Sequence, residues 1–260
     1  MSSNTPVSML IDINVRFTRQ LTASRKMCTD SLSFENKMAP ILYRIDASSP
    51  ANAVRTLADM IGVELELKDV NFLVNEHKSP EYLKINPAGT VPSLIDDDFV
   101  VSDSHSIMKY LLSKYGGDKA ESLYPSDLRT RTLVDQAMFY DTGVLFIRLT
   151  SITIPSIYGS LTEVSDKHKQ DIENSYSVLE AYLQTRKYVA ADHLTLGDLS
   201  VGATTNSLQP FHKLDSHKFP RTADWLSRMQ QEPSFNKIME PATKLLAQAI
   251  SGFWQRNKQK

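Results

Sequence analysis

Strand and helix signals alternate only in the first half of the chain, and beyond Leu128 helical periodicity alone remains. The alternation begins with Ile41–Ile45, an apolar run that predicts a buried strand, and a Ser-Ser-Pro turn follows at residues 48–50. Apolar residues at helical spacing from Val54 onward, ended by a glycine, predict a helix. Because Glu64–Asn71 alternates as a second strand, we expect a parallel strand-helix-strand unit at the start of the fold.

Further signals extend this unit to the order βαβαββα. Glu81–Ile85 predicts a short helix, Val91–Ile95 and Phe99–Val101 predict a hairpin across an acidic turn, and Ser104–Tyr115 predicts a helix ended by glycines. The second half contains five segments of helical period: Arg129–Ser151, Ser165–Thr185, Leu196–Leu208, Thr222–Gln231 and Phe235–Phe253. We therefore predict an α/β domain followed by an all-α domain.

Composition changes place the boundaries of these parts. Residues 1–38 form an N-terminal extension rich in Ser, Thr and Arg, residues 39–117 the first domain, residues 118–127 a polar linker, and residues 128–260 the helical domain. The extension is expected to be unstructured, with Met38 as an alternative start, and the predicted location is cytoplasmic. The competing interpretation of its Arg-rich pattern is a mitochondrial transit peptide.

Charge and cysteine content exclude several classes of function. Lys and Arg number 29 against 30 Asp and Glu, so no net field attracts nucleic acid or an anionic membrane. No run of about 18 apolar residues indicates a membrane span. Cys28 is the only cysteine, which excludes an internal disulfide, and the histidines in the helical half lack the spacing of metal ligands. We predict no metal, nucleic-acid or membrane partner.

Short motifs across most of the chain share one order and spacing with a known family. They are Ser48-Ser49-Pro50, Leu83-Lys84-Ile85-Asn86-Pro87, Thr90-Val91-Pro92-Ser93-Leu94, Asp103-Ser104-His105-Ser106-Ile107, Ser122-Leu123-Tyr124-Pro125, Gly143–Arg148 and Leu194–Leu199. In this order the chain resembles the cytosolic glutathione transferases, nearest to the insect epsilon (delta-epsilon) class. The resemblance implies a thioredoxin-like N-terminal domain and an all-helical C-terminal domain that lines the site of the hydrophobic substrate.

The same resemblance implies an activity and its partners. Such enzymes conjugate glutathione, their co-substrate, to hydrophobic electrophiles in the detoxification of xenobiotics, insecticides among them, and they form two-fold homodimers. The alternative is a relative with low conjugating activity that carries hydrophobic ligands or serves a steroid-hormone pathway.

Ser48 is the predicted catalytic residue. A free thiol has a pKa near about 8.5, and only its thiolate is the nucleophile, so an enzyme of this kind must stabilise the sulfur anion. A serine hydroxyl at the start of a helix can donate a hydrogen bond to that sulfur, and the helix dipole adds to the effect. Ser49 competes for this role, but its position directly before Pro50 favours the helix cap instead.

Other residues are assigned to glutathione by the resemblance. Val91 is expected to pair through its backbone with the cysteinyl part, with a cis bond to Pro92, while Asp103 and Ser104 are expected to hold the γ-glutamyl end. The consecutive residues 103–105 cannot form a hydrolytic Ser-His-Asp triad, because neighbouring side chains point in different directions. His77 is expected at the glycyl end.

One departure and one helix face complete the sequence-based picture. Gly89 stands where the epsilon pattern has histidine, so one contact between a cation and the glycyl carboxylate is expected to be missing. The resemblance places Tyr140, Val144, Ile147 and Arg148 on the helix face that lines the electrophile cleft. Phe253 and Trp254 near the C-terminus are expected either to cover that cleft or to lie on an exposed tail.

Overall fold

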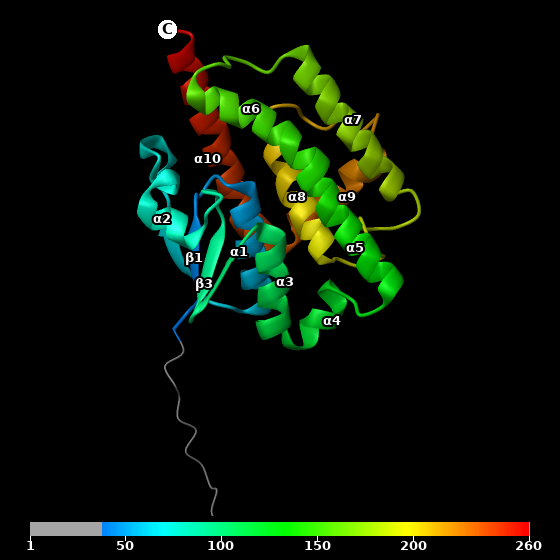
Figure 1. The fold of residues 1–260 in the computed structure, drawn as a ribbon. Coiled ribbons are helices and arrows are strands. Elements are labelled where there is room, and N and C mark those ends of the chain that lie inside the picture. Colours follow the sequence, from blue (N-terminus) through cyan, green and yellow to red (C-terminus); the bar gives the residue numbers. More distant parts are fainter. Residues whose placement is uncertain (1–37, 260) are drawn as a thin grey trace, which may run out of the picture. The chain divides into compact units, whose positions relative to one another are not determined.

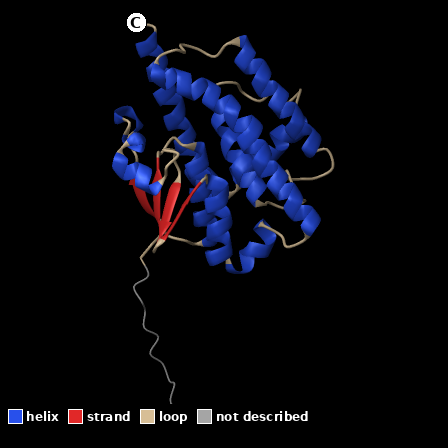
Figure 2. Cartoon of the chain, viewed as in Figure 1, coloured by secondary structure: helices blue, strands red, loops and turns tan. Residues whose placement is uncertain are grey.

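The computed structural model describes residues 38–259, and its strands form one mixed sheet of four. The strands are β1 (Ile41–Arg44), β2 (Glu66–Asp69), β3 (Ser93–Asp96) and β4 (Phe99–Ser102). Their order in the sheet is β2-β1-β3-β4, with β1 parallel to β2 and the other two pairs antiparallel. Figure 2 shows the strands together in one part of the molecule and helices everywhere else. The predicted strand-helix-strand unit and hairpin are confirmed.

Helices cover both faces of this sheet. In Figure 1, α1 (Ser49–Ile61) and α3 (Ser104–Tyr115) lie on the opposite side of the sheet from α2 (Pro80–Ile85). α1 begins at the cap residue Ser48 and ends at Gly62, whose φ of +74° belongs to the left-handed region that glycine adopts without strain. Between β2 and α2 the chain forms two short 3-10 helices, η2 (Phe72–Val74) and η3 (Glu76–Lys78). These connections carry several of the candidate site residues.

The second half is entirely helical in the described residues, as predicted. Its elements are η4 (Gly117–Lys119), α4 (Ala120–Leu123), α5 (Leu128–Tyr140), η5 (Asp141–Leu145), α6 (Phe146–Tyr158), α7 (Asp166–Tyr182), α8 (Leu196–Leu208), α9 (Pro220–Gln231) and α10 (Pro233–Asn257). Every residue of α8 is buried, and α1 packs against both α8 and α10. The core therefore runs without a break from the sheet domain into the helical half.

The long helix predicted at Arg129–Ser151 is interrupted. η5 is a π-helix, which inserts an extra residue between α5 and α6 and rotates everything after it by about 100° relative to a continuous α-helix. The combined segment Leu128–Tyr158 contains an 18-residue window with a mean hydropathy of 1.2, and 44% of that window is buried in the structure. Core helices and membrane spans share this composition, so the window alone does not distinguish them.

A buried carboxylate fastens the start of α8. Asp198 accepts hydrogen bonds from the backbone N–H and hydroxyl of Thr195 at 2.9 and 2.8 Å, and from the backbone N–H of Val189 at 2.8 Å. It also accepts one from the indole N–H of Trp225 on α9 at 2.9 Å. Because Asp198 is fully buried, these donors replace the water that its carboxylate loses. The cluster ties α8, α9 and the loop before α8 together.

Candidate functional site

One edge of the sheet gathers the predicted site residues. Tyr43 on β1 lies opposite Ser93 on β3, and Ser93 lies opposite Ser102 on β4. Because β3 runs antiparallel to both neighbours, the end of β1, the start of β3 and the end of β4 all meet at this edge. Ser48 follows β1, Val91 precedes β3, and Asp103 follows β4. Residues distant in sequence are therefore brought to one side of the domain.

A cavity of about 330 Å³ opens beside Ser48, between the sheet domain and the helical half. From the first half it is lined mainly by Ile45, Ala47, Ser48, Ser49, Phe72 and Val91. From the second half it is lined mainly by Phe146, Leu149, Thr150, Thr153, Ile154 and Ile157 on α6. No charged side chain lines it within the described part of the chain, and hydroxyl groups are its main polar features. Such a lining suits an uncharged apolar molecule.

Ser48 caps α1, which corrects the expectation that Ser49 would do so. The Ser48 hydroxyl accepts a long hydrogen bond of 3.4 Å from the backbone N–H of Ala51, and this use of its oxygen leaves its proton free to donate. Ser49 instead is buried, with its hydroxyl 3.3 Å from that of Thr204 on α8. Of the two serines, Ser48 has the available donor at a helix N-terminus.

The bond between Val91 and Pro92 is cis, as predicted. Among residues 38–259, neither the backbone N–H nor the C=O of Val91 has a hydrogen-bond partner. The preceding carbonyl, of Thr90, is held by the Tyr82 hydroxyl at 2.7 Å and by the Asn86 side-chain amide at 2.8 Å. Val91 therefore offers a fixed, unpaired backbone edge beside the cavity, to which a short peptide can bind as a strand does.

Asp103 and Ser104 form the N-terminus of α3. Asp103 has a φ of +76°, a strained value for a residue other than glycine, and its Oδ1 accepts hydrogen bonds from the N–H groups of His105 and Ser106, both at 3.0 Å. The hydroxyl of Ser104 has no hydrogen-bond partner among the described residues, although Ser104 is only 6% exposed. A free hydroxyl and a helix N-terminus together can bind a carboxylate.

A serine, a histidine and an aspartate meet behind this helix end. His105 Nε2 lies 2.5 Å from the Ser200 hydroxyl oxygen and 3.3 Å from Asp141 Oδ2, and the Ser200 hydroxyl donates to that same carboxylate at 2.5 Å. In a hydrolytic triad the imidazole bridges serine and carboxylate through its two different nitrogens. Here one nitrogen faces both groups and Ser200 is buried, so the cluster connects α3 to α8 and η5 rather than attacking a substrate.

His77 lies buried behind the cavity wall. Its ring stacks on that of Phe72, with the centroids 3.8 Å apart and the planes at 11°, and Phe72 in turn lines the cavity. Burial, together with the neighbouring charge of Lys78, lowers the pKa of His77 below its ordinary value. The imidazole is therefore neutral at pH 7 and supplies no positive charge.

Gly89 has a φ of +60°, and the side chain of Lys78 folds over it. The Lys78 ammonium donates to the carbonyl oxygens of Ala88 and Gly89, both at 3.1 Å. A Cβ atom at position 89 would lie 2.7 Å from that ammonium nitrogen and 2.7 Å from the carbonyl oxygen of His77. Glycine is therefore required here both by the backbone conformation and by the space that Lys78 fills.

The residues that sequence reasoning assigned to the electrophile do not line this cavity. The Tyr140 hydroxyl donates to the carbonyl of Ser175 on α7 at 2.6 Å, and the charge of Arg148 acts on Asp171 of the same helix. Val144 is partly buried against the core, and Ile147 is 47% exposed. The π-helix causes this outcome, because its extra residue turns a different face of α6 toward Ser48.

The cavity-lining residues of α6 carry a signal that the sequence-based prediction missed. Phe146, Leu149, Thr153 and Ile157 recur at spacings of three and four, which marks one helix face. Leu246 on α10 also lines the cavity. The expectation for Trp254 was wrong, since its indole N–H donates to the Ser156 hydroxyl at 2.7 Å and its ring packs against the core.

Searching the described residues found no group of three or more His, Cys, Asp or Glu side chains able to hold a metal ion. The site consists instead of hydroxyl groups, unpaired backbone groups, two helix N-termini and an apolar cavity.

Comparisons with known proteins agree with this architecture. A family model described as "Glutathione S-transferase, N-terminal domain" matches residues 42–119, and one described as "Glutathione S-transferase, C-terminal domain" matches residues 136–233. Glutathione S-transferase D7 of Anopheles gambiae is 35% identical over 214 residues, which cover 81% of the chain and 96% of that relative.

Solved structures show the same similarity. The epsilon-class glutathione S-transferase of the housefly, Musca domestica, superposes with a TM-score of 0.79 at 40% identity, covering 82% of the chain and 98% of that structure. A glutathione transferase homologue from Drosophila mojavensis, solved with bound glutathione, superposes with a TM-score of 0.73 at 37% identity, covering 84% and 97%.

Proposed function

The chain belongs to the glutathione S-transferase family, and we propose that it conjugates glutathione to hydrophobic electrophiles with Ser48 stabilising the glutathione thiolate. The observation that carries this proposal is the Ser48 hydroxyl, whose proton is free at the N-terminus of α1 and beside an apolar cavity. The proposed step is a nucleophilic substitution or addition. The thiol proton leaves to solvent, and the sulfur bonds to the electrophilic carbon while any leaving group departs with its electron pair.

The energetics of thiolate stabilisation are adequate for this role. A free thiol with a pKa of about 8.5 is only a few per cent ionised at neutral pH. Lowering that pKa by about 2 units requires roughly 2.7 kcal/mol of preferential binding to the anion. One hydrogen bond to a charged acceptor supplies about 1.5–3 kcal/mol, and the dipole of α1 adds about 0.3–1 kcal/mol. Ser48 and α1 together suffice, and no covalent bond to the serine is needed.

The rest of glutathione is proposed to lie along the same edge of the sheet. The carboxylate of Asp103 would attract the γ-glutamyl ammonium, while the hydroxyl of Ser104 would bind the γ-glutamyl carboxylate at the start of α3. The unpaired backbone of Val91, fixed by the cis bond to Pro92, would pair with the cysteinyl residue. His77 is proposed to support the glycyl end through Phe72 rather than through charge.

The cavity on α6 is proposed to bind the electrophile. Because its lining is almost wholly apolar and holds no charged side chain, it favours neutral hydrophobic molecules over anions. The sequence-based assignment of the electrophile to Tyr140, Val144, Ile147 and Arg148 is not part of this proposal. Detoxification of xenobiotics, insecticides among them, is the physiological role we propose for such a site.

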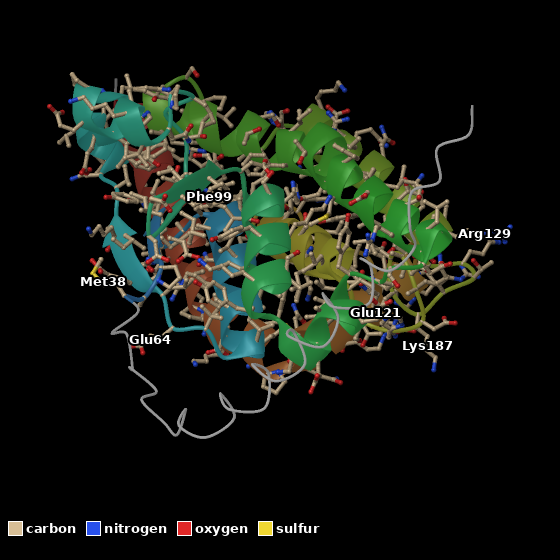
Figure 3. The ribbon with its side chains drawn as sticks, turned by 60° about the horizontal axis from the view of Figure 1, so that its bottom comes forward. Met38, Glu64, Phe99, Glu121, Arg129 and Lys187 are labelled. Atoms are coloured by element: carbon tan, nitrogen blue, oxygen red, sulfur yellow. The ribbon has the colours of Figure 1, made fainter. Side chains whose placement is uncertain are left out.

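We also propose an epsilon-class enzyme that works as a homodimer in the cytoplasm. The epsilon assignment is supported by the 40% identity to the housefly structure. A dimer is supported by apolar side chains exposed around α3: Phe99 on β4 is 45% exposed beside Tyr110, and Phe139 on α5 is 75% exposed (Figure 3 labels Phe99). The mitochondrial alternative is not supported, and residues 1–37 lie outside the described residues.

A conjugation assay with glutathione and a chloronitrobenzene tests the function. We expect turnover by the wild type and a slow, poorly pH-dependent rate from Ser48→Ala. The alternative, a carrier of hydrophobic ligands, is favoured by the apolar cavity alone. It would be supported if both proteins showed equal, weak rates while still binding an apolar fluorescent dye in competition with hydrophobic compounds.

A further inference from the structure

The proposed seat of glutathione fixes where its glycyl end must lie, and the inference below rests on that function. The γ-glutamyl end lies at Asp103, after β4, and the cysteinyl residue lies at Val91, before β3. Since the sheet order is β2-β1-β3-β4, continuing from Asp103 past Val91 leads toward the side of β2. The segment that follows β2 contains η3, which includes Lys78, and Gly89 shortly precedes Val91. The glycyl carboxylate therefore points toward the contact between Lys78 and Gly89.

A carboxylate at this place needs a cation, and Lys78 is the suitable one. His77 is close, but its pKa is lowered by burial and by Lys78, so its ring is neutral. Within residues 38–259, Lys78 forms no ion pair with any carboxylate. Its ammonium is fixed by the carbonyl oxygens of Ala88 and Gly89, and an ammonium has three donors, so one remains for a ligand.

The absence of a side chain at position 89 makes this arrangement possible. The Lys78 nitrogen lies 2.7 Å from the place that a Cβ at position 89 would occupy. Any side chain there would displace the lysine, whereas glycine lets the ammonium lie directly against the backbone that leads into Thr90 and Val91. Two positions thus act together, a glycine that clears the space and a lysine that fills it with positive charge.

We propose that the Lys78 ammonium binds the glycyl carboxylate of glutathione and so determines affinity for the free-acid form of the tripeptide. This changes the sequence-based expectation for Gly89. The glycine does not leave the glycyl end without a cation, because the cation comes from a neighbouring element of the chain.

The test measures binding of two ligands, glutathione and its glycyl amide, to the wild type and to Lys78→Gln by calorimetry. A charge-assisted contact to the carboxylate predicts that the variant loses about tenfold in affinity for glutathione. The same variant should bind the amide as the wild type does, because the amide has no carboxylate to lose. Lys78→Arg should retain most of the affinity for glutathione.

Lys84→Gln is the matched control, since Lys84 is an exposed lysine on the neighbouring α2 and its loss changes the net charge equally. Equal affinities for glutathione in Lys78→Gln and Lys84→Gln would overturn the inference, as would equal losses for glutathione and its amide. Wild-type protein that bound neither ligand would overturn the proposed function, and the inference with it. A wild type that bound both ligands with an unaffected Lys78→Gln variant would overturn the inference alone.

Discussion

Replacing Ser48 by alanine tests the central step of the proposed mechanism, the ionisation of the bound thiol. The hydroxyl of Ser48 already accepts a bond from Ala51 N–H, so the hydrogen bond it can donate is the interaction that the variant removes. A bond to a sulfur anion is worth about 1.5–3 kcal/mol. At 1.36 kcal/mol per pKa unit, the pKa of the bound thiol should rise by about 1–2 units.

This shift has a characteristic pH profile. Below the wild-type thiol pKa, both proteins need the minor ionised form, and the variant should react about 10–100-fold more slowly. Above the pKa of the variant, both thiols are ionised and the rates should converge. The assay is the pH dependence of kcat/KM for a chloronitrobenzene, together with thiolate absorbance of bound glutathione titrated against pH.

Ser49→Ala is the control for this experiment. Ser49 is the adjacent serine, but its hydroxyl faces Thr204 on α8, so its loss should leave the thiol titration unchanged. Loss of the α1 cap in Ser48→Ala costs about 1 kcal/mol of stability, which urea unfolding measures separately. An unaltered thiol pKa in Ser48→Ala, with glutathione fully bound, would refute the proposed role of the hydroxyl.

Four further outcomes are expected. Arg148→Ala should change KM for either substrate by no more than about twofold in steady-state assays, because Arg148 does not line the cavity. Thr153→Phe should raise KM for a bulky electrophile at least about fivefold and leave KM for glutathione unchanged, because the ring fills cavity space on the electrophile side. Asp198→Ala should lower the unfolding free energy by about 3–5 kcal/mol and Tm by roughly 10 °C in a thermal melt, because the donors around the carboxylate lose their acceptor. The hydrogen bond from Lys237 lowers the pKa of Asp59 below 3.8, so this stabilisation, under about 1 kcal/mol, is present above that pH and lost as pH falls through the folded-state pKa; urea unfolding should show Asp59→Asn less stable at pH 7 and equal to wild type in strong acid.

Much of the first domain could be predicted from local sequence. The apolar run at Ile41–Ile45, the turn at residues 48–50 and the hairpin before Ser102 each give their structure through short-range spacing, and all appear in the fold. The cis bond at Val91–Pro92 was expected from the family resemblance and is present. The candidate site was less predictable. Local pattern could not distinguish Ser48 from Ser49 as the cap, since both are good capping residues and only packing on α8 separates them.

The sequence by itself determined the order of strands and helices, because turn residues and apolar periodicity act over a few neighbours. Tertiary structure decided which side chains share a site. The π-helix at Asp141–Leu145 turned Phe146 and Leu149, instead of Arg148, toward the cavity, and the fold laid Lys78 across Gly89. The physical reason is that a single inserted residue or a missing Cβ changes direction and space by amounts that only contacts between distant segments select.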